Sequence, residues 1–154
     1  PEDMLNSLFD ELVTYKKQTQ NSGPIIKELD DAFHQADFKD KIEFKVSVKI
    51  PVLDRKITAA YAYQNGSLNL VKPELFTGKK WIEKASLLAT EGRFIKKRET
   101  PTSLIIVPEI YEEDGGKRSN IFSSLEGIFE DAKIRTIWPD KRSEFIQEVK
   151  EQAH

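Results

Sequence analysis

A short glycine-containing segment late in the chain carries residue types that bind anions. Residues 114–119 read Asp-Gly-Gly-Lys-Arg-Ser and follow an apolar stretch that is typical of a buried strand. Backbone amides, basic side chains and a hydroxyl at such a place favour a phosphate-like ligand, with Lys117, Arg118 and Ser119 as contacts. The glycine spacing of a phosphate-binding loop is missing, however, and a solvated surface loop is the simpler interpretation.

Residues for metal or nucleophilic chemistry are sparse. The chain has no cysteine and only two histidines, His34 and the terminal His154. A thiolate zinc site and a thiol nucleophile are therefore excluded, and a histidine metal cluster has too few members. The Gly-x-Ser-x-Gly pattern of an exposed nucleophilic serine is also missing. The sequence thus predicts no catalytic residue, no metal ligand and no cofactor, which favours a protein that is not an enzyme.

Basic residues gather in the middle of the chain, where one surface edge could contact phosphate groups. Each such contact adds salt-dependent affinity for nucleic acid. Glu83, Glu91 and Glu99 lie among these residues, and solvated helix ends explain the cluster equally well. The nucleic-acid-binding residues predicted by this interpretation are Lys72, Lys79, Lys80, Arg93, Lys96 and Lys97.

Length and composition favour one domain that spans residues 1–154. The 24 basic and 26 acidic residues give a formal net charge of -2, which argues against a dedicated DNA-binding domain. No apolar stretch is long enough to span a bilayer, so we expect a cytoplasmic protein without a membrane partner. The start at Pro1, with Met4 as the only methionine, favours a fragment of a longer protein over removal of an initiator methionine.

Apolar periodicity places two helices at the start of the chain. Residues 3–19 and a second segment that begins at Pro24 each show apolar side chains at helical spacing. The turn residues Asn-Ser-Gly-Pro at 21–24 separate them, and Pro24 suits the first position of the second helix. We therefore expect residues 1–37 to form a helical hairpin that packs on the sheet formed by residues 40–154.

Three strands follow, because the apolar period changes to two. The first, at residues 42–50, is expected to bury one face made of Ile42, Phe44, Val46, Val48 and Ile50. The second, at 57–64, is expected to place Ile57, Ala59, Tyr61 and Tyr63 on a single face. Asn65 and Gly66 predict a type I′ turn into a third strand at 67–72, which Pro73 should stop.

The rest of the chain alternates between helices and strands. A helix is expected at about 79–91 with Gly92 as its C-cap, followed by a buried strand at 104–107. A polar loop, a helix at about 121–129, a short strand at 134–138 and a helix from about residue 143 complete the order. The sequence therefore predicts an α+β fold, in which the antiparallel three-stranded meander extends by βαβα into one mixed sheet flanked by helices.

The order helix, three strands, helix, strand over about residues 24–108 resembles the restriction-endonuclease-like fold. Active members carry an acid on the second strand and Glu-x-Lys on the third, and these carboxylates hold a divalent cation. Here the second strand has no acid, and Leu70 and Lys72 stand at the positions of the glutamate and the lysine. Glu43-Phe44-Lys45 lies on the first strand, only three residues after Asp40. The resemblance thus implies a nuclease-like core without its metal site.

Residues 63–73 and 88–92 are also similar to C-terminal regions of bacterial and phage proteins. Because the fold is well patterned and no catalytic set converges in it, we expect a non-catalytic interaction or regulatory domain of a bacterial or phage protein, with a protein partner or a second copy of itself. The alternative is a nucleic-acid-binding or nuclease-like domain that uses the basic edge. An enzyme that acts on a small anion through residues 114–119 ranks third.

Overall fold

The structure, a computed structural model, describes residues 24–111 and 118–153. The expected helix at 3–19 and Lys117 lie outside these residues, and so do the side chains of Arg118 and Ser119. The anion-binding prediction for residues 114–119 is therefore not placed by the structure.

A five-stranded mixed sheet forms the centre of the fold, and its strands follow one another in chain order. They are β1 (Glu43–Ile50), β2 (Arg55–Gln64), β3 (Leu68–Phe76), β4 (Thr102–Ile110) and β5 (Arg135–Thr136). The first three strands are antiparallel neighbours, whereas β3, β4 and β5 run parallel to one another. The predicted α+β class, a meander extended into a mixed sheet flanked by helices, is confirmed.

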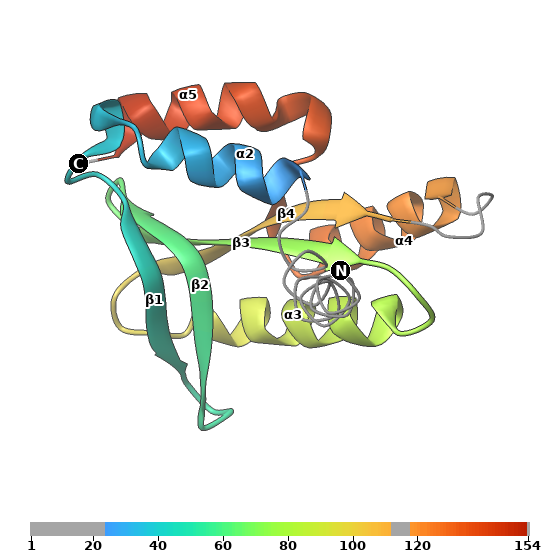
Figure 1. The fold of residues 1–154 in the computed structure, drawn as a ribbon. Helices are drawn as coiled ribbons and strands as arrows, with labels where there is room; N and C mark the ends of the chain where they lie inside the picture. Colours follow the sequence, from blue (N-terminus) through green and yellow to red (C-terminus); the bar gives the residue numbers. More distant parts are fainter. Residues whose placement is uncertain (1–23, 112–117, 154) are drawn as a thin grey trace, which may run out of the picture.

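Two helices cover each face of the sheet (Figure 1). On one face lie α2 (Pro24–Phe33) and α5 (Arg142–Gln152), and on the other lie α3 (Trp81–Ile95) and α4 (Arg118–Asp131). Short 3-10 helices, η1 (Ala36–Phe38) and η2 (Pro139–Lys141), follow α2 and precede α5. Each face has its own apolar core, so alternate residues of the central strands pack against different helices.

The prediction that β1 buries a single continuous face is wrong. Ile42 packs in the core under α2 and α5, and Phe44 contacts Tyr61 of that core. Val46 packs instead against the core under α3 and α4. The cause is Lys45, whose φ of +54° turns the strand between Phe44 and Val46 so that the alternation shifts by one residue.

The apolar residues of β2, which pairs with β1, change to the other face of the sheet opposite Lys45. Ala59 belongs to the core under α3, whereas Tyr61 and Tyr63 belong to the core under α2 and α5. The prediction that these residues share one face is therefore wrong as well. Lys45 and Ala60 form no pair in the ladder, yet the register is the same on both sides of them. The apolar residues of both strands thus change to the opposite face of the sheet at the same position. The hairpin pairing is preserved, and the hairpin contributes side chains to both cores.

The β2–β3 connection also differs from the prediction. Gln64 pairs with Leu68, so the turn has three residues, and the positive φ of 100° belongs to Gly66 and not to Asn65. A type I′ turn needs both central residues at positive φ, so this turn is of another type. Pro73 does not stop β3, because β2 pairs only as far as Val71 and the missing amide breaks no ladder there.

The helix that crosses from β3 to β4 is longer than expected. It continues through Gly92 to Ile95, so Gly92 is an interior residue and not a C-cap. A Cβ atom at Gly92 would lie 2.3 Å from Cδ1 of Ile134 and 3.4 Å from Cδ2 of Leu104. The glycine therefore permits close packing of α3 against the segment before β5, which the cap interpretation missed.

Candidate functional site

Charged residues gather where β2 and β3 separate, a place that we call the sheet opening. Pairing between the two strands ends at Tyr61 and Val71. Beyond that pair, β2 continues with β1, and β3 continues with β4 as far as Phe76 and Ile110. The β1–β2 hairpin consequently runs away from β3 and past α3 (Figure 1). The charged residues of the sheet opening are Arg55, Lys72, Glu74, Lys84 and Glu91.

Glu91 is the most deeply buried charged residue of this group. It lies in α3 with 4% of its surface exposed, and its Oε2 atom is 3.1 Å from Nη2 of Arg55. Burial raises the pKa of Glu91, the nearby charges of Lys72 and Arg55 oppose that rise, and Glu74 adds to it. The balance is a pKa above the ordinary value, so the ionised form is maintained at a cost to the fold.

The second carboxylate of the opening, Glu74, is held by two lysines. Its Oε2 atom lies 3.3 Å from Nζ of Lys72, two residues earlier on the same face of β3. Its Oε1 atom lies 3.0 Å from Nζ of Lys84 in α3. Lys84 also donates a hydrogen bond of 2.7 Å to the carbonyl oxygen of Leu75. Both oxygens of Glu74 are therefore occupied by cationic partners.

The opening pairs its two carboxylates with three cations, so positive charge is in excess by one. A divalent cation would need free carboxylate oxygens, and those of Glu74 already face lysine ammonium groups. Within residues 24–111 and 118–153, no group of three or more histidine, aspartate or glutamate side chains is placed to hold a metal ion. The arrangement suits structural ion pairing between β2, β3 and α3.

Of the five residues, only Lys72 was predicted from the sequence as a site residue, and the two carboxylates were missed for identifiable reasons. Glu74 was missed because the third strand was expected to stop at Pro73. Glu91 was assigned to a solvated basic cluster, although it lies three residues after the buried Leu88 on the same helical face. Helical spacing from Leu88, together with the adjacent Gly92, was the available signal.

The structure does not bring the predicted basic residues to one edge. Lys72 is half-buried at the sheet opening, and Lys79 and Lys80 are exposed just before α3. The remaining three lie at the far end of α3, whose 15 residues span about 22 Å. These three are Arg93, Lys96 and Lys97.

The residues at the far end of α3 have partners within the chain. Arg93 forms an ion pair of 2.6 Å with Asp131 of α4. Lys96 donates a hydrogen bond of 2.5 Å to the carbonyl oxygen of Lys133. The ammonium of Lys97 lies 4.9 Å from the ring centre of Phe94. The contacts of Arg93 and Lys96 tie the end of α3 to α4 and to the segment that follows it, whereas Lys97 packs on α3 itself.

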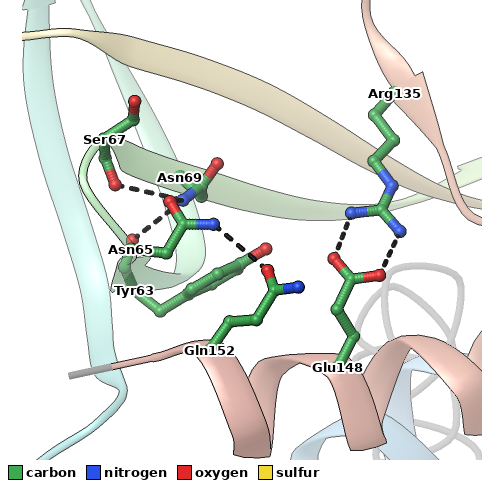
Figure 2. Close-up of polar contacts among 7 residues, drawn as sticks. All are labelled: Tyr63, Asn65, Ser67, Asn69, Arg135, Glu148 and Gln152. Atoms are coloured by element: carbon green, nitrogen blue, oxygen red, sulfur yellow. Dashed lines mark hydrogen bonds and ion pairs between the residues drawn. The ribbon is translucent and has the colours of Figure 1, made fainter.

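A second polar cluster lies at the β2–β3 turn (Figure 2). The buried Asn69 donates from Nδ2 to Oδ1 of Asn65 at 2.8 Å and to the carbonyl oxygen of Ser67 at 3.1 Å. Asn65 in turn donates to Oε1 of Gln152 in α5 at 3.4 Å. Tyr63 lies beside them, and burial raises the pKa of its hydroxyl. The cluster closes the turn and joins it to α5.

The same view shows a clamp between β5 and α5. Arg135 binds Glu148 through two hydrogen bonds of 2.5 and 2.6 Å (Figure 2). These hydrogen bonds raise the pKa of Arg135 and lower that of Glu148. The guanidinium carbon also lies 5.5 Å from the ring centre of Phe145. The clamp holds the two-residue edge strand against α5.

Comparison with protein-family models, with curated proteins and with solved structures found no match. None of the helices in the described part of the chain is long and apolar enough to cross a membrane.

Proposed function

We propose that this chain is a non-catalytic interaction or regulatory domain. The observation that carries the proposal is the pairing of Glu74, whose two carboxylate oxygens face Lys72 and Lys84. A metal-dependent nuclease needs carboxylates that are open to the cation. Here a cation would have to displace two lysines, one of which is also hydrogen-bonded to the backbone. Ion pairs thus occupy both oxygens of the carboxylate beside Lys72, the residue at the lysine position of the nuclease-like pattern.

Exposed aromatic pairs on the surface support a binding role. The ring of Phe44 in β1 stacks on His34 with 4.4 Å between ring centres, and Phe44 remains 40% exposed. On the other side of the sheet, Phe122 in α4 stacks on Trp138 at 4.3 Å. Partly exposed aromatic side chains are common at protein interfaces, where they bury a large area at small entropic cost. A protein partner or a second copy of the chain is the partner class that we infer.

The location that we propose is the cytoplasm of a bacterium or of a phage-infected bacterium. The absence of cysteine is compatible with a reducing compartment, where disulfides contribute nothing to the fold.

Metal binding and cleavage assays test the non-catalytic proposal. Isothermal titration with Mn²⁺ or Mg²⁺ should give no binding heat, and labelled DNA and RNA should remain intact in the same buffers. The Lys72→Ala/Lys84→Ala variant is the matched control, since it frees both oxygens of Glu74 and should gain weak Mn²⁺ affinity. Cleavage by the wild-type chain that disappears in Glu74→Gln would show that the opening is an active site.

The alternative function is nucleic-acid binding through a basic edge, and one observation favours it. Lys79 and Lys80 are exposed where the chain enters α3, after the carboxyl end of β3. Because β3 and β4 are parallel neighbours, both strands end at the same edge of the sheet. Charge reversal of Lys79 and Lys80 tests this alternative, which is compared below with a second basic surface.

A further inference from the structure

The part of the β1–β2 hairpin that leaves the sheet forms a two-stranded ribbon, residues 45–60, which we call the ribbon arm. Its inner face packs on the core under α3 and α4 and is apolar. The inner residues are Val46, Val48, Ile50, Ile57 and Ala59. The outer face therefore carries the residues that alternate with them, of which Ser47, Lys49, Lys56 and Thr58 are exposed and polar.

The outer face holds two cross-strand pairs of unusual composition. Ser47 lies opposite Thr58, and their hydroxyl oxygens are 2.8 Å apart. Two residues closer to the β1–β2 turn, Lys49 lies directly opposite Lys56. Opposite residues have Cβ atoms about 5 Å apart, so like charges there destabilise a hairpin. The ribbon thus maintains a repulsive lysine pair beside a hydroxyl pair.

Little in the ribbon arm offsets this positive charge. Lys49 approaches Asp54 at 3.6 Å, but both side chains are largely exposed, so the contact contributes little. Between residues 45 and 60, Asp54 is the only acidic residue, against four basic ones at 45, 49, 55 and 56. Arg55 is paired with Glu91. The arm is therefore locally basic in a chain whose formal net charge is -2.

We propose that the outer face of the ribbon arm binds the phosphate backbone of a nucleic acid. Lys49 and Lys56 neutralise phosphates, and the one hydroxyl proton that the Ser47–Thr58 hydrogen bond leaves free is donated to a phosphate oxygen. The inference rests on the proposed non-catalytic binding function and adds a nucleic-acid partner to the protein partner inferred above. A bound polyanion relieves the repulsion between Lys49 and Lys56, so binding offsets the destabilisation that the lysine pair causes in the hairpin. An anionic membrane fits less well, because Val52 in the turn is the one large apolar side chain of residues 45–60 that is mostly exposed.

The test is a fluorescence-anisotropy titration of the full chain with a labelled DNA duplex at about 50 mM and about 200 mM salt. Lys49→Glu/Lys56→Glu should weaken binding at least tenfold at the lower salt. It should also reduce the slope of log affinity against log salt by about two, one for each lost phosphate contact. Lys27→Glu/Lys39→Glu is the matched control, with the same charge change at exposed positions outside both basic surfaces, and should bind nearly as the wild type does. Lys79→Glu/Lys80→Glu tests the alternative edge in the same titration. Circular dichroism of all three variants checks that they fold.

Three results would overturn the ribbon-arm site. The first is that the wild type binds neither DNA nor RNA. The second is that nucleic-acid binding is lost only in the Lys79→Glu/Lys80→Glu variant. The third is that the wild type binds phosphatidylserine vesicles and does not bind nucleic acid. Gel analysis of the same samples reports on the proposed function separately. Cleavage would contradict the non-catalytic proposal, whereas the ribbon-arm site depends only on binding and its salt slope.

Discussion

The guanidinium of Arg55, at the first position of β2, lies 3.1 Å from the carboxylate of Glu91 in α3. This pair joins the ribbon arm to the helix that its inner face covers, next to the place where β2 and β3 part. The two partners differ in environment, since the side chain of Glu91 is 5% exposed and that of Arg55 is 48% exposed. The free-energy cost of removing the pair from water therefore falls mainly on the carboxylate of Glu91.

Replacement of Glu91 by glutamine tests whether the buried carboxylate bears most of this desolvation cost. Loss of one partner of a fully buried pair usually destabilises by about 3–5 kcal/mol, because the other charge is left unpaired. Arg55 is exposed enough to be hydrated instead. We therefore expect Glu91→Gln to leave the free energy of unfolding at pH 7 unchanged or to raise it. A loss of about 3 kcal/mol or more in urea unfolding would contradict this expectation.

The same variant isolates the pH dependence of Glu91. Burial raises its pKa in the folded state above that of the unfolded chain. The folded state therefore binds the proton more tightly, and its stability contribution is complete below the unfolded pKa and is lost as pH rises through the folded pKa. Relative to Glu91→Gln, the wild type should gain stability as pH falls from 7 toward 4. Urea unfolding of both proteins across that range measures the difference.

Glu148 should behave in the opposite way. Its hydrogen bonds to Arg135 lower its pKa in the folded state, so its contribution is present above the unfolded pKa. That contribution is lost as pH falls through the lower, folded pKa. We expect wild type and Glu148→Gln to differ in melting temperature at pH 7 and to converge toward pH 3. A difference that persists at pH 3 would mean that packing, and not charge, is the contribution of Glu148.

Gly92 and Gly127 form a matched pair of helical glycines. Alanine at Gly92 would place its Cβ atom 2.3 Å from Cδ1 of Ile134, whereas alanine at Gly127 would meet nothing within 4 Å. Overpacking costs about 1–3 kcal/mol, and alanine gains about 1 kcal/mol in helix propensity over glycine. Gly92→Ala should therefore destabilise the protein, and Gly127→Ala should stabilise it by up to about 1 kcal/mol. Chemical denaturation of both variants would show the opposite signs.

Sequence patterns predicted the order of elements because each apolar period reflects local geometry. They failed where a residue's role depends on distant parts of the chain. The positive φ of Lys45 exists because β1 must serve two helical layers, and no local signal marks it. Gly92 resembled a cap, although its reason is the close approach of Ile134, more than 40 residues away.

The candidate site was predictable only in part. Lys72 was identified from its charge, but its partner Glu74 lay beyond the expected strand end at Pro73. Pro73 is tolerated because β2 has already left β3 at that level, a consequence of the sheet opening itself. The lysine pair at 49 and 56 depends on hairpin register, which a turn without a standard signature did not fix in advance.

Lys56→Glu separates the fold from the proposed binding. The substitution places an acidic residue opposite Lys49, so cross-strand repulsion becomes attraction and should stabilise the hairpin by about 0.2–1 kcal/mol. The same substitution removes one proposed phosphate contact and adds a repulsive charge, so affinity for duplex DNA should fall and the salt slope should decrease by about one. Higher stability with weaker binding would show that the lysine pair is maintained for a ligand and not for the fold. Unchanged binding would instead exclude Lys56 as a phosphate contact, because a structural role alone would change only the unfolding free energy.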